Sequence, residues 1–122
     1  MNELQQKRCL PCEGGIPKLT PSTAQNHLAQ LSGAWELEES IKVKGHFIFK
    51  DFYEAMGFAN AVAFIANSEN HHPFITIGWG SCDIIYWTHA IQGLSTNDFI
   101  CAAKIDALYE HYQAPPPLCK IS

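Results

Sequence analysis

Four stretches of the chain alternate between apolar and polar positions with a period of two. In the last of them, Cys82, Ile84, Tyr86 and Thr88 share one face, and the residues between them share the other. Such alternation predicts β-strands with one buried face. Short turns join the strands in pairs, so we expect two antiparallel hairpins. The predicted strands cover residues 35–38, 41–50, 74–79 and 82–89.

Apolar residues recur at helical spacing in three further stretches. Thr20 is a good N-cap for the first helix, and Asp51 can cap the central one. The apolar arc of the central helix is so wide that we expect this helix in the core, with part of it at a subunit interface. Ser95 and, three residues later, Asp98 form a capping box for the last helix, which ends before the prolines of residues 115–117.

These elements predict an α+β fold. Their order, α-β-β-α-β-β-α, gives a single four-stranded antiparallel sheet with helices packed on one face. A chain of 122 residues is long enough for one domain with its own hydrophobic core. We place this domain at residues 20–113, after an irregular leader at 1–19 that contains prolines and glycines. We expect the Pro-rich tail at 114–122 to be disordered.

The charge of the chain argues against two classes of partner. Lys and Arg total eight against twelve Asp and Glu, so the chain lacks the basic face that direct nucleic-acid binding requires. No apolar run reaches the roughly 18 residues that cross a bilayer. The first residues also lack the apolar region of a signal peptide, so we expect a cytoplasmic protein with no membrane partner.

The five cysteines do not suggest a disulfide framework, because their number is odd and their spacing irregular. Cys82 and Cys101 lie inside predicted elements, where we expect them to be small buried apolar residues. Cys9 and Cys12 form a CxxC in the leader. A zinc site would need two more ligands, and a redox CxxC usually follows a strand, so an ordinary ordered loop is the favoured interpretation.

The histidines carry the candidate chemistry. His71 and His72 stand directly before Pro73, which ends the central helix and restricts His72 to extended geometry. His89 follows at the end of the fourth predicted strand. Imidazole titrates near neutrality, so the three residues suggest proton transfer. The alternatives are a structural role for His89 and a metal-ligand pair at residues 71–72; no Cys, Asp or Glu cluster stands at ligand spacing, so we predict no metal site.

The order of these residues resembles the pterin-4a-carbinolamine dehydratases, also called 4a-hydroxytetrahydrobiopterin dehydratases. The set is His71-His72-Pro73, an aromatic residue six positions later (Trp79), His89 ten positions after that, and Asp98 nine further on, with FKDF…GF before it and GLS before the aspartate. The likeness extends from the leader to the last helix. One position departs from the family, which usually has an ionisable residue where this chain has Asn67. Either that carboxylate is dispensable, or the neighbouring Glu69 substitutes for it, or the activity is altered.

The resemblance implies dehydration of a reduced pterin that carries a hydroxyl on C4a and a proton on N5. A base removes the N5 proton and an acid protonates the departing hydroxyl, with the pterin as substrate and no metal or organic cofactor. We expect His72 and His89 to carry the protons, and His71 to shape the pocket and contact the substrate hydroxyl. Substrate-binding or supporting residues in this interpretation are Pro73, Trp79, Trp87, Asp98, Asn67 and Glu69.

Two other functions stay open at this point. Some members of the family act as dimerisation adaptors for a transcription factor, and a relative could serve another pterin pathway, such as molybdenum cofactor metabolism. The set of three histidines favours an enzyme, because an adaptor does not need them. The resemblance further implies recycling of the cofactor of an aromatic amino acid hydroxylase. Unpaired sheet edges and the apolar central helix favour a homodimer or a homotetramer.

Overall fold

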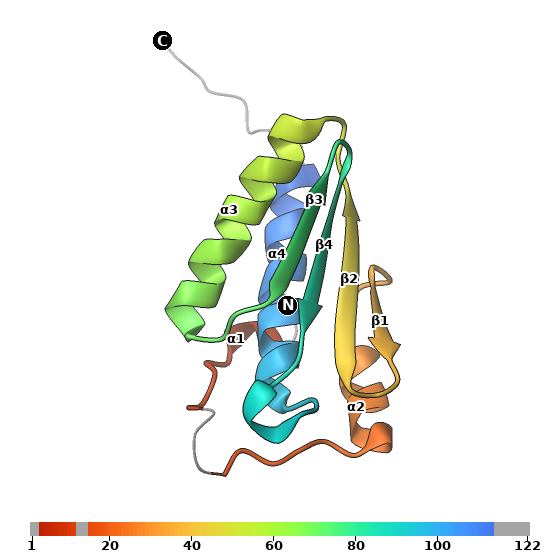
Figure 1. Ribbon diagram of the computed structural model, residues 1–122, viewed down its shortest axis with the longest axis vertical. Coiled ribbons are helices and arrows are strands. Elements are labelled where there is room, and N and C mark those ends of the chain that lie inside the picture. Colours follow the sequence, from red (N-terminus) through yellow and green to blue (C-terminus); the bar gives the residue numbers. More distant parts are fainter. Residues whose placement is uncertain (1–2, 12–14, 114–122) are drawn as a thin grey trace.

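The computed structural model describes residues 3–11 and 15–113, and its centre is one four-stranded antiparallel sheet (Figure 1). The elements are α1 (Glu3–Gln6), α2 (Pro21–Leu28), β1 (Trp35–Glu38), β2 (Lys42–Ile48), α3 (Phe52–Glu69), β3 (Phe74–Gly78), β4 (Ser81–Tyr86), the short 3-10 helix η1 (His89–Ile91) and α4 (Thr96–Gln113). From α2 onward and apart from η1, this is the predicted order α-β-β-α-β-β-α, so the predicted fold class is confirmed.

The strand order in the sheet is β1-β2-β4-β3. The two hairpins therefore meet through β2 and β4, and β3 lies at an edge. In the second hairpin, Phe74 at the start of β3 pairs with Ile85 near the end of β4. The segment that precedes β3 and the segment that follows β4 consequently lie at the same end of the hairpin.

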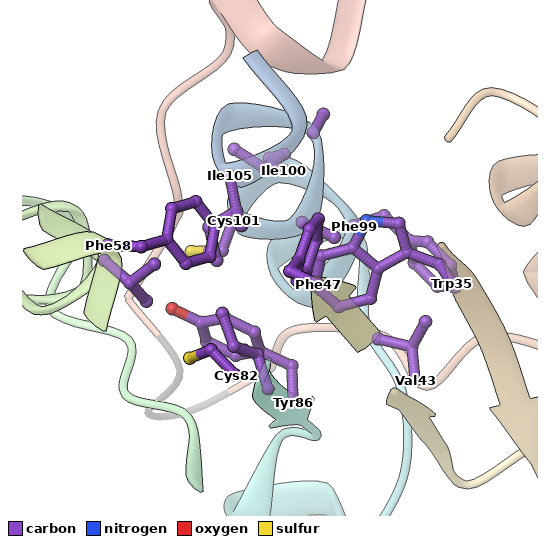
Figure 2. Close-up of a cluster of buried hydrophobic side chains, with 14 of the residues drawn as sticks. Trp35, Val43, Phe47, Phe58, Cys82, Tyr86, Phe99, Ile100, Cys101 and Ile105 are labelled. Atoms are coloured by element: carbon purple, nitrogen blue, oxygen red, sulfur yellow. The ribbon is translucent and has the colours of Figure 1, made fainter. Parts of the chain in front are cut away.

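One face of the sheet carries the core and packs against α3 and α4 (Figure 1). The buried residues of β4 are Cys82, Ile84 and Tyr86, which is the alternation predicted from the sequence. Figure 2 shows the side chains of Cys82 and Tyr86 beside those of α4, with rings from β1, β2 and α3 completing the cluster. A Cβ atom on Gly45 of β2 would lie 2.8 Å from the ring of Phe47, so only glycine fits there.

Side chains at the helix termini satisfy backbone groups as the sequence predicts. Thr20 accepts a hydrogen bond from the amide of Thr23, and Asp51 accepts one of 2.9 Å from the amide of Glu54. The α4 helix begins after Ser95, whose amide donates to the Asp98 carboxylate at 2.9 Å. These contacts fix where each helix begins, and the last of them also fixes a carboxylate that the candidate site uses.

The structure departs from the sequence predictions in three places. The fourth strand ends at Tyr86, so His89 lies in η1 and not in a strand, because the chain leaves the sheet after Tyr86 and Thr88 forms an isolated bridge with Gly93. The leader is not wholly irregular: it contains α1, whose Leu4 is buried. Phe52 and Met56, on the predicted apolar arc of α3, are exposed in this chain and not in its core, as are Tyr53 and Phe64 outside that arc.

The tail at 114–122 and Cys12 lie outside the described residues. In the part of the chain that the structure describes, α3 and α4 reach 18 residues each, and neither is apolar enough to cross a bilayer.

Candidate functional site

The histidine pair lies at the junction between α3 and β3. Asn70 ends α3 in the left-handed region, with φ of 52°, a conformation that asparagine tolerates better than most residues. The His71 amide still donates to the carbonyl of Ala66 at 3.0 Å. Pro73 then directs the chain into β3. The junction therefore gives the two neighbouring histidines different surroundings.

His71 is buried and held on two sides. Its Nε2 lies 2.6 Å from Oδ1 of Asp98. Its ring stacks on the ring of Tyr86, with the centroids 5.2 Å apart and the planes 18° apart. The Tyr86 hydroxyl donates to the His71 carbonyl at 3.0 Å. Burial raises the pKa of Tyr86 above its ordinary value, so this hydroxyl keeps its proton and remains a donor at neutral pH.

Asp98 is fully buried and saturated with partners. Its Oδ2 accepts hydrogen bonds from the Thr88 hydroxyl and the Ser95 amide, both at 2.9 Å. The hydroxyls of Thr88 and Ser95 lie 2.7 Å apart. A buried carboxylate is tolerated only when it is paired and hydrogen-bonded, and Asp98 meets both conditions. Its position three residues after Ser95 therefore caps α4 and orients His71 at once.

His72 is exposed and has a neutral partner. Its Nε2 lies 3.0 Å from Oδ1 of Asn67 in the last turn of α3. Because the amide oxygen accepts, Nε2 carries the proton, and in the neutral ring Nδ1 keeps the lone pair. Asn67, the position at which the chain departs from the family, is therefore a direct partner of the imidazole.

His89 is exposed at the start of η1 and packs beside two aromatic rings. Its ring centroid lies 4.4 Å from that of Trp87 and 6.1 Å from that of Phe74. Phe74 and Trp87 stack nearly parallel, with their centroids 5.0 Å apart. The ammonium of Lys42 lies 4.3 Å from the centroid of the Trp87 ring. Trp87 and Phe74 thus form an aromatic shelf beside the third histidine.

The hairpin register brings the exposed histidines to one end of the sheet. His72 lies two residues before Phe74, and His89 follows the strand that pairs with it. Trp79 lies in the β3–β4 turn, about 16 Å along the strand from Phe74, so within one chain it is apart from the histidines. Glu69 is apart as well, because its carboxylate binds Arg8 and the Cys9 amide.

Sequence reasoning missed three residues of the site, Tyr86, Thr88 and Phe74. A signal existed for Thr88, since its hydroxyl falls on the buried face of the predicted strand and a buried hydroxyl needs a partner. The strand pattern placed Tyr86 on the same buried face but gave no indication of His71 as its neighbour. Phe74 offered no signal, because its ring contacts depend on the register between two strands.

The cysteines give no ligand set in the described residues. Cys82 and Cys101 are buried, as predicted, and burial raises the pKa of Cys82 to about 11. The Cys9 and Cys101 sulfurs lie 3.6 Å apart. Within residues 3–11 and 15–113, no three His, Cys, Asp or Glu side chains come together in a way that could hold a metal ion.

Comparison with known proteins identifies the family. The family model described as "Pterin 4 alpha carbinolamine dehydratase" matches residues 17–108. A protein from Nitrosomonas eutropha named as a pterin-4-alpha-carbinolamine dehydratase is 47% identical over 106 residues, which cover 87% of this chain and 93% of that protein. One of the same name from Legionella pneumophila (strain Lens) is 48% identical over 108 residues, covering 88% and 96%.

Solved structures agree with the fold. A transcriptional coactivator/pterin dehydratase from Brucella melitensis superimposes with a TM-score of 0.71 at 29% identity, over 76% of this chain and 99% of that one. A pterin dehydratase-like protein described as a RuBisCO assembly factor matches with a TM-score of 0.53 at 20% identity, over 62% of this chain and 89% of that one, which shows only that the fold is shared. On the family model and the relatives together, this chain belongs to the pterin-4a-carbinolamine dehydratase family of hydro-lyases.

Proposed function

We propose that this protein dehydrates 4a-hydroxytetrahydrobiopterin to quinonoid dihydropterin and water. In this reaction the N5–H bond breaks, a double bond forms between N5 and C4a, and the C4a–O bond breaks as the hydroxyl leaves with an added proton. The observation that carries the proposal is that two exposed imidazoles, His72 and His89, flank the same end of the β3–β4 hairpin, and that His72 directly follows the buried His71, the partner of Asp98.

His72 is the proposed base. Its Nε2–H is directed to Asn67, so its Nδ1 is the basic atom that accepts the N5 proton. Because its ring is exposed, the imidazolium that forms can return the proton to water after each turnover. The neutral amide of Asn67 orients the ring and adds no negative charge beside it. In this scheme Asn67 replaces the orienting function of the family's ionisable residue.

His89 is the proposed acid that protonates the leaving hydroxyl. Phe74 and Trp87 restrict the position of its ring, and their faces offer a flat surface on which the pterin can stack. His71 does not exchange protons in this scheme, because Asp98 occupies its Nε2 and its ring is buried. It forms a rigid wall of the site. The predicted contact of His71 with the substrate hydroxyl is part of the same proposal. Pro73 has a supporting role, since it restricts the backbone between the histidine pair and β3.

The proposed physiological role is recycling of tetrahydrobiopterin for aromatic amino acid hydroxylation, in a homodimer or homotetramer. Two features of the described residues support assembly. The edge strand β3 has one unpaired side in this chain, and open strand edges are usually paired or covered in the native assembly. On α3, Tyr53 is 89% exposed and Phe64 is 73% exposed, more apolar surface than one helix of a monomer usually presents.

The test is the decay of freshly generated 4a-hydroxytetrahydropterin, followed by absorbance against the uncatalysed rate. Wild type should accelerate the decay. His72→Ala and His89→Ala should each remove most of this acceleration, since general acid–base assistance contributes about 10²- to 10⁴-fold. His111→Ala is the matched control, because His111 is an exposed histidine in the last turn of α4.

Two results would contradict the proposal. If folded wild type matches the uncatalysed rate, the protein does not dehydrate this substrate, and an adaptor function or another pterin pathway becomes the better account. If the substrate decays as fast with His72→Ala and with His89→Ala as with His111→Ala, the protein is active but these two imidazoles do not provide the acceleration.

A further inference from the structure

The leader contacts each of the three segments that supply the candidate site. It comprises residues 3–11 and 15–19 of the described chain, and most of it precedes the residues 17–108 that the family model matches. Figure 1 shows the leader crossing the end of the molecule at which α3 ends and α4 begins. Its contacts fall into three groups, one on each segment.

The first group lies on the last turn of α3. Glu69, whose side chain is 5% exposed, accepts from Arg8 Nε at 2.8 Å and from the Cys9 amide at 2.7 Å. Arg8 Nη2 also donates to the Ser68 carbonyl at 3.0 Å. The ammonium of Lys104 on α4 lies 3.9 Å from the same carboxylate. The turn that leads into the histidine pair is thus tied to the leader and to α4.

The second group lies on the first turn of α4. Asn97 is buried, and its side chain binds both polar groups of the Leu10 backbone: Oδ1 accepts from the amide at 2.9 Å, and Nδ2 donates to the carbonyl at 2.7 Å. This paired contact fixes the position and the orientation of the leader. Asn97 directly precedes Asp98, so the leader is anchored one residue away from the partner of His71.

The third group lies on the loop that follows His89. The Leu19 amide donates to the Leu94 carbonyl at 2.8 Å. The side-chain stem of Lys18 lies so close to Gly93 that a Cβ atom there would meet its Cε at 2.5 Å. Gly93 in turn bridges to Thr88. The leader therefore packs against the loop that holds the third histidine.

We propose that the leader is a strap that positions the site, and that Glu69 and Asn97 are the positioning residues that hold it. The His71–Asp98 bond and the Glu69–Lys104 ion pair join the end of α3 to α4 directly, and the leader adds a further link from Glu69 through Cys9 and Leu10 to Asn97. Because this link reaches α4 next to Asp98, it limits how far the two segments can pivot about the His71–Asp98 bond. The proposal rests on the proposed dehydratase function for its activity readout.

Two isosteric substitutions test the strap without creating a cavity. Glu69→Gln keeps an acceptor oxygen for the Cys9 amide and loses the charge that pairs with Arg8 and Lys104. Asn97→Asp keeps the acceptor for the Leu10 amide, loses the donor to the Leu10 carbonyl and sets a carboxylate against it. The matched control is Glu110→Gln, at an exposed glutamate of α4. Each variant and the double variant are measured for kcat, KM, unfolding by urea, and exchange of the His71 Nε2–H proton by NMR.

Each single substitution should lower kcat about tenfold with little change in KM, since small displacements of reacting groups cost one to two orders of magnitude. The His71 proton should exchange faster in both variants, and the double variant should lose less than the product of the two, because both act on one strap. The proposal is overturned if kcat and His71 exchange match the control, or if the loss of kcat follows only the unfolded fraction. If wild type has no dehydratase activity, the proposed function fails. Exchange of the His71 Nε2–H proton in the variants still tests whether the leader positions His71.

Discussion

The two neighbouring histidines of the site have opposite surroundings. His71 is 6% exposed, paired with a fully buried carboxylate and stacked on a tyrosine. His72, the next residue, is exposed, and its Nε2 is bonded to the neutral side-chain amide of Asn67. In a buried, charge-assisted pair both groups are held in one geometry. An exposed ring with a neutral partner can gain and lose protons.

This difference divides the residues of the candidate site into a buried half and an exposed half. The buried half comprises His71, Tyr86, Thr88 and Asp98. These residues are part of the folded core, so substitutions there should lower the free energy of unfolding. The exposed half, comprising His72, His89 and Asn67, contributes little to folding and should govern activity. Substitutions in the two halves should therefore have separable effects on activity and on stability.

The double variant His72→Ala/His89→Ala should lose the full general acid–base contribution, about 10²- to 10⁴-fold in kcat. Its free energy of unfolding should change by no more than about 0.5 kcal/mol per substitution, because both side chains are exposed. The measurements are dehydratase kinetics and urea unfolding on the same preparation. A large loss of stability would show that the exposed half also supports the fold.

Asp98→Ala should destabilise the protein by about 3–5 kcal/mol, because it leaves His71, Thr88 and the Ser95 amide without their buried partner. Urea unfolding measures this loss. Asp98→Asn is the control: it keeps an oxygen for the capping contact and should cost less. A loss below about 1 kcal/mol for Asp98→Ala would contradict a structural role for the buried half.

Asn67→Asp should move the acid limb of the pH–rate profile to higher pH by about one unit. A carboxylate beside His72 stabilises the imidazolium, so the neutral ring that acts as base is reached only at higher pH. The shift should shrink as salt is added, because the pair is exposed. Asn60→Asp, at an exposed position earlier on α3, is the matched control and should leave the profile unchanged. An equal shift in both variants would indicate a general charge effect and no specific contact.

Tyr86→Phe should cost about 1 kcal/mol at neutral pH, through loss of the hydrogen bond to the His71 carbonyl. It should also alter the alkaline stability profile. Burial raises the pKa of Tyr86 above its ordinary value of 10.0, so the folded state keeps a proton that the unfolded chain releases. This contribution is complete below pH 10 and is lost as the pH rises further. Unfolding measured from pH 9 to 11 should therefore show a flatter decline for Tyr86→Phe than for wild type.

Much of the fold could be predicted because its signals are local. The period-two alternation of residues 82–88 reports which face of β4 is buried, and burial of Cys82, Ile84 and Tyr86 agrees with it. Thr20 and Asp51 cap helices through bonds to residues three positions away. Asp98 as a capping residue was predictable for the same reason. Interactions within one turn or one strand depend on few residues, so the sequence specifies them directly.

The site was only partly predictable because its contacts join distant segments. The sequence pattern selects His71, His72 and His89 but does not distinguish the buried one from the exposed ones. That distinction depends on the packing of α4 against the α3–β3 junction, which brings Asp98 to His71 across 27 positions. His89 likewise lies outside β4, in a segment where Thr88 bridges to Gly93 and not to a neighbouring strand.

The amino-acid pattern was enough to predict the helices and strands from α2 to α4, their order, and the three imidazoles, but it missed α1 and η1. The partners depend on the folded chain: Asn67 for His72, Asp98 and Tyr86 for His71, and the leader for Glu69. The physical reason is the range of the interactions. Backbone propensity, capping and amphipathic period act over a few residues, whereas a buried carboxylate or a strap acquires its role only when elements far apart in the chain pack together.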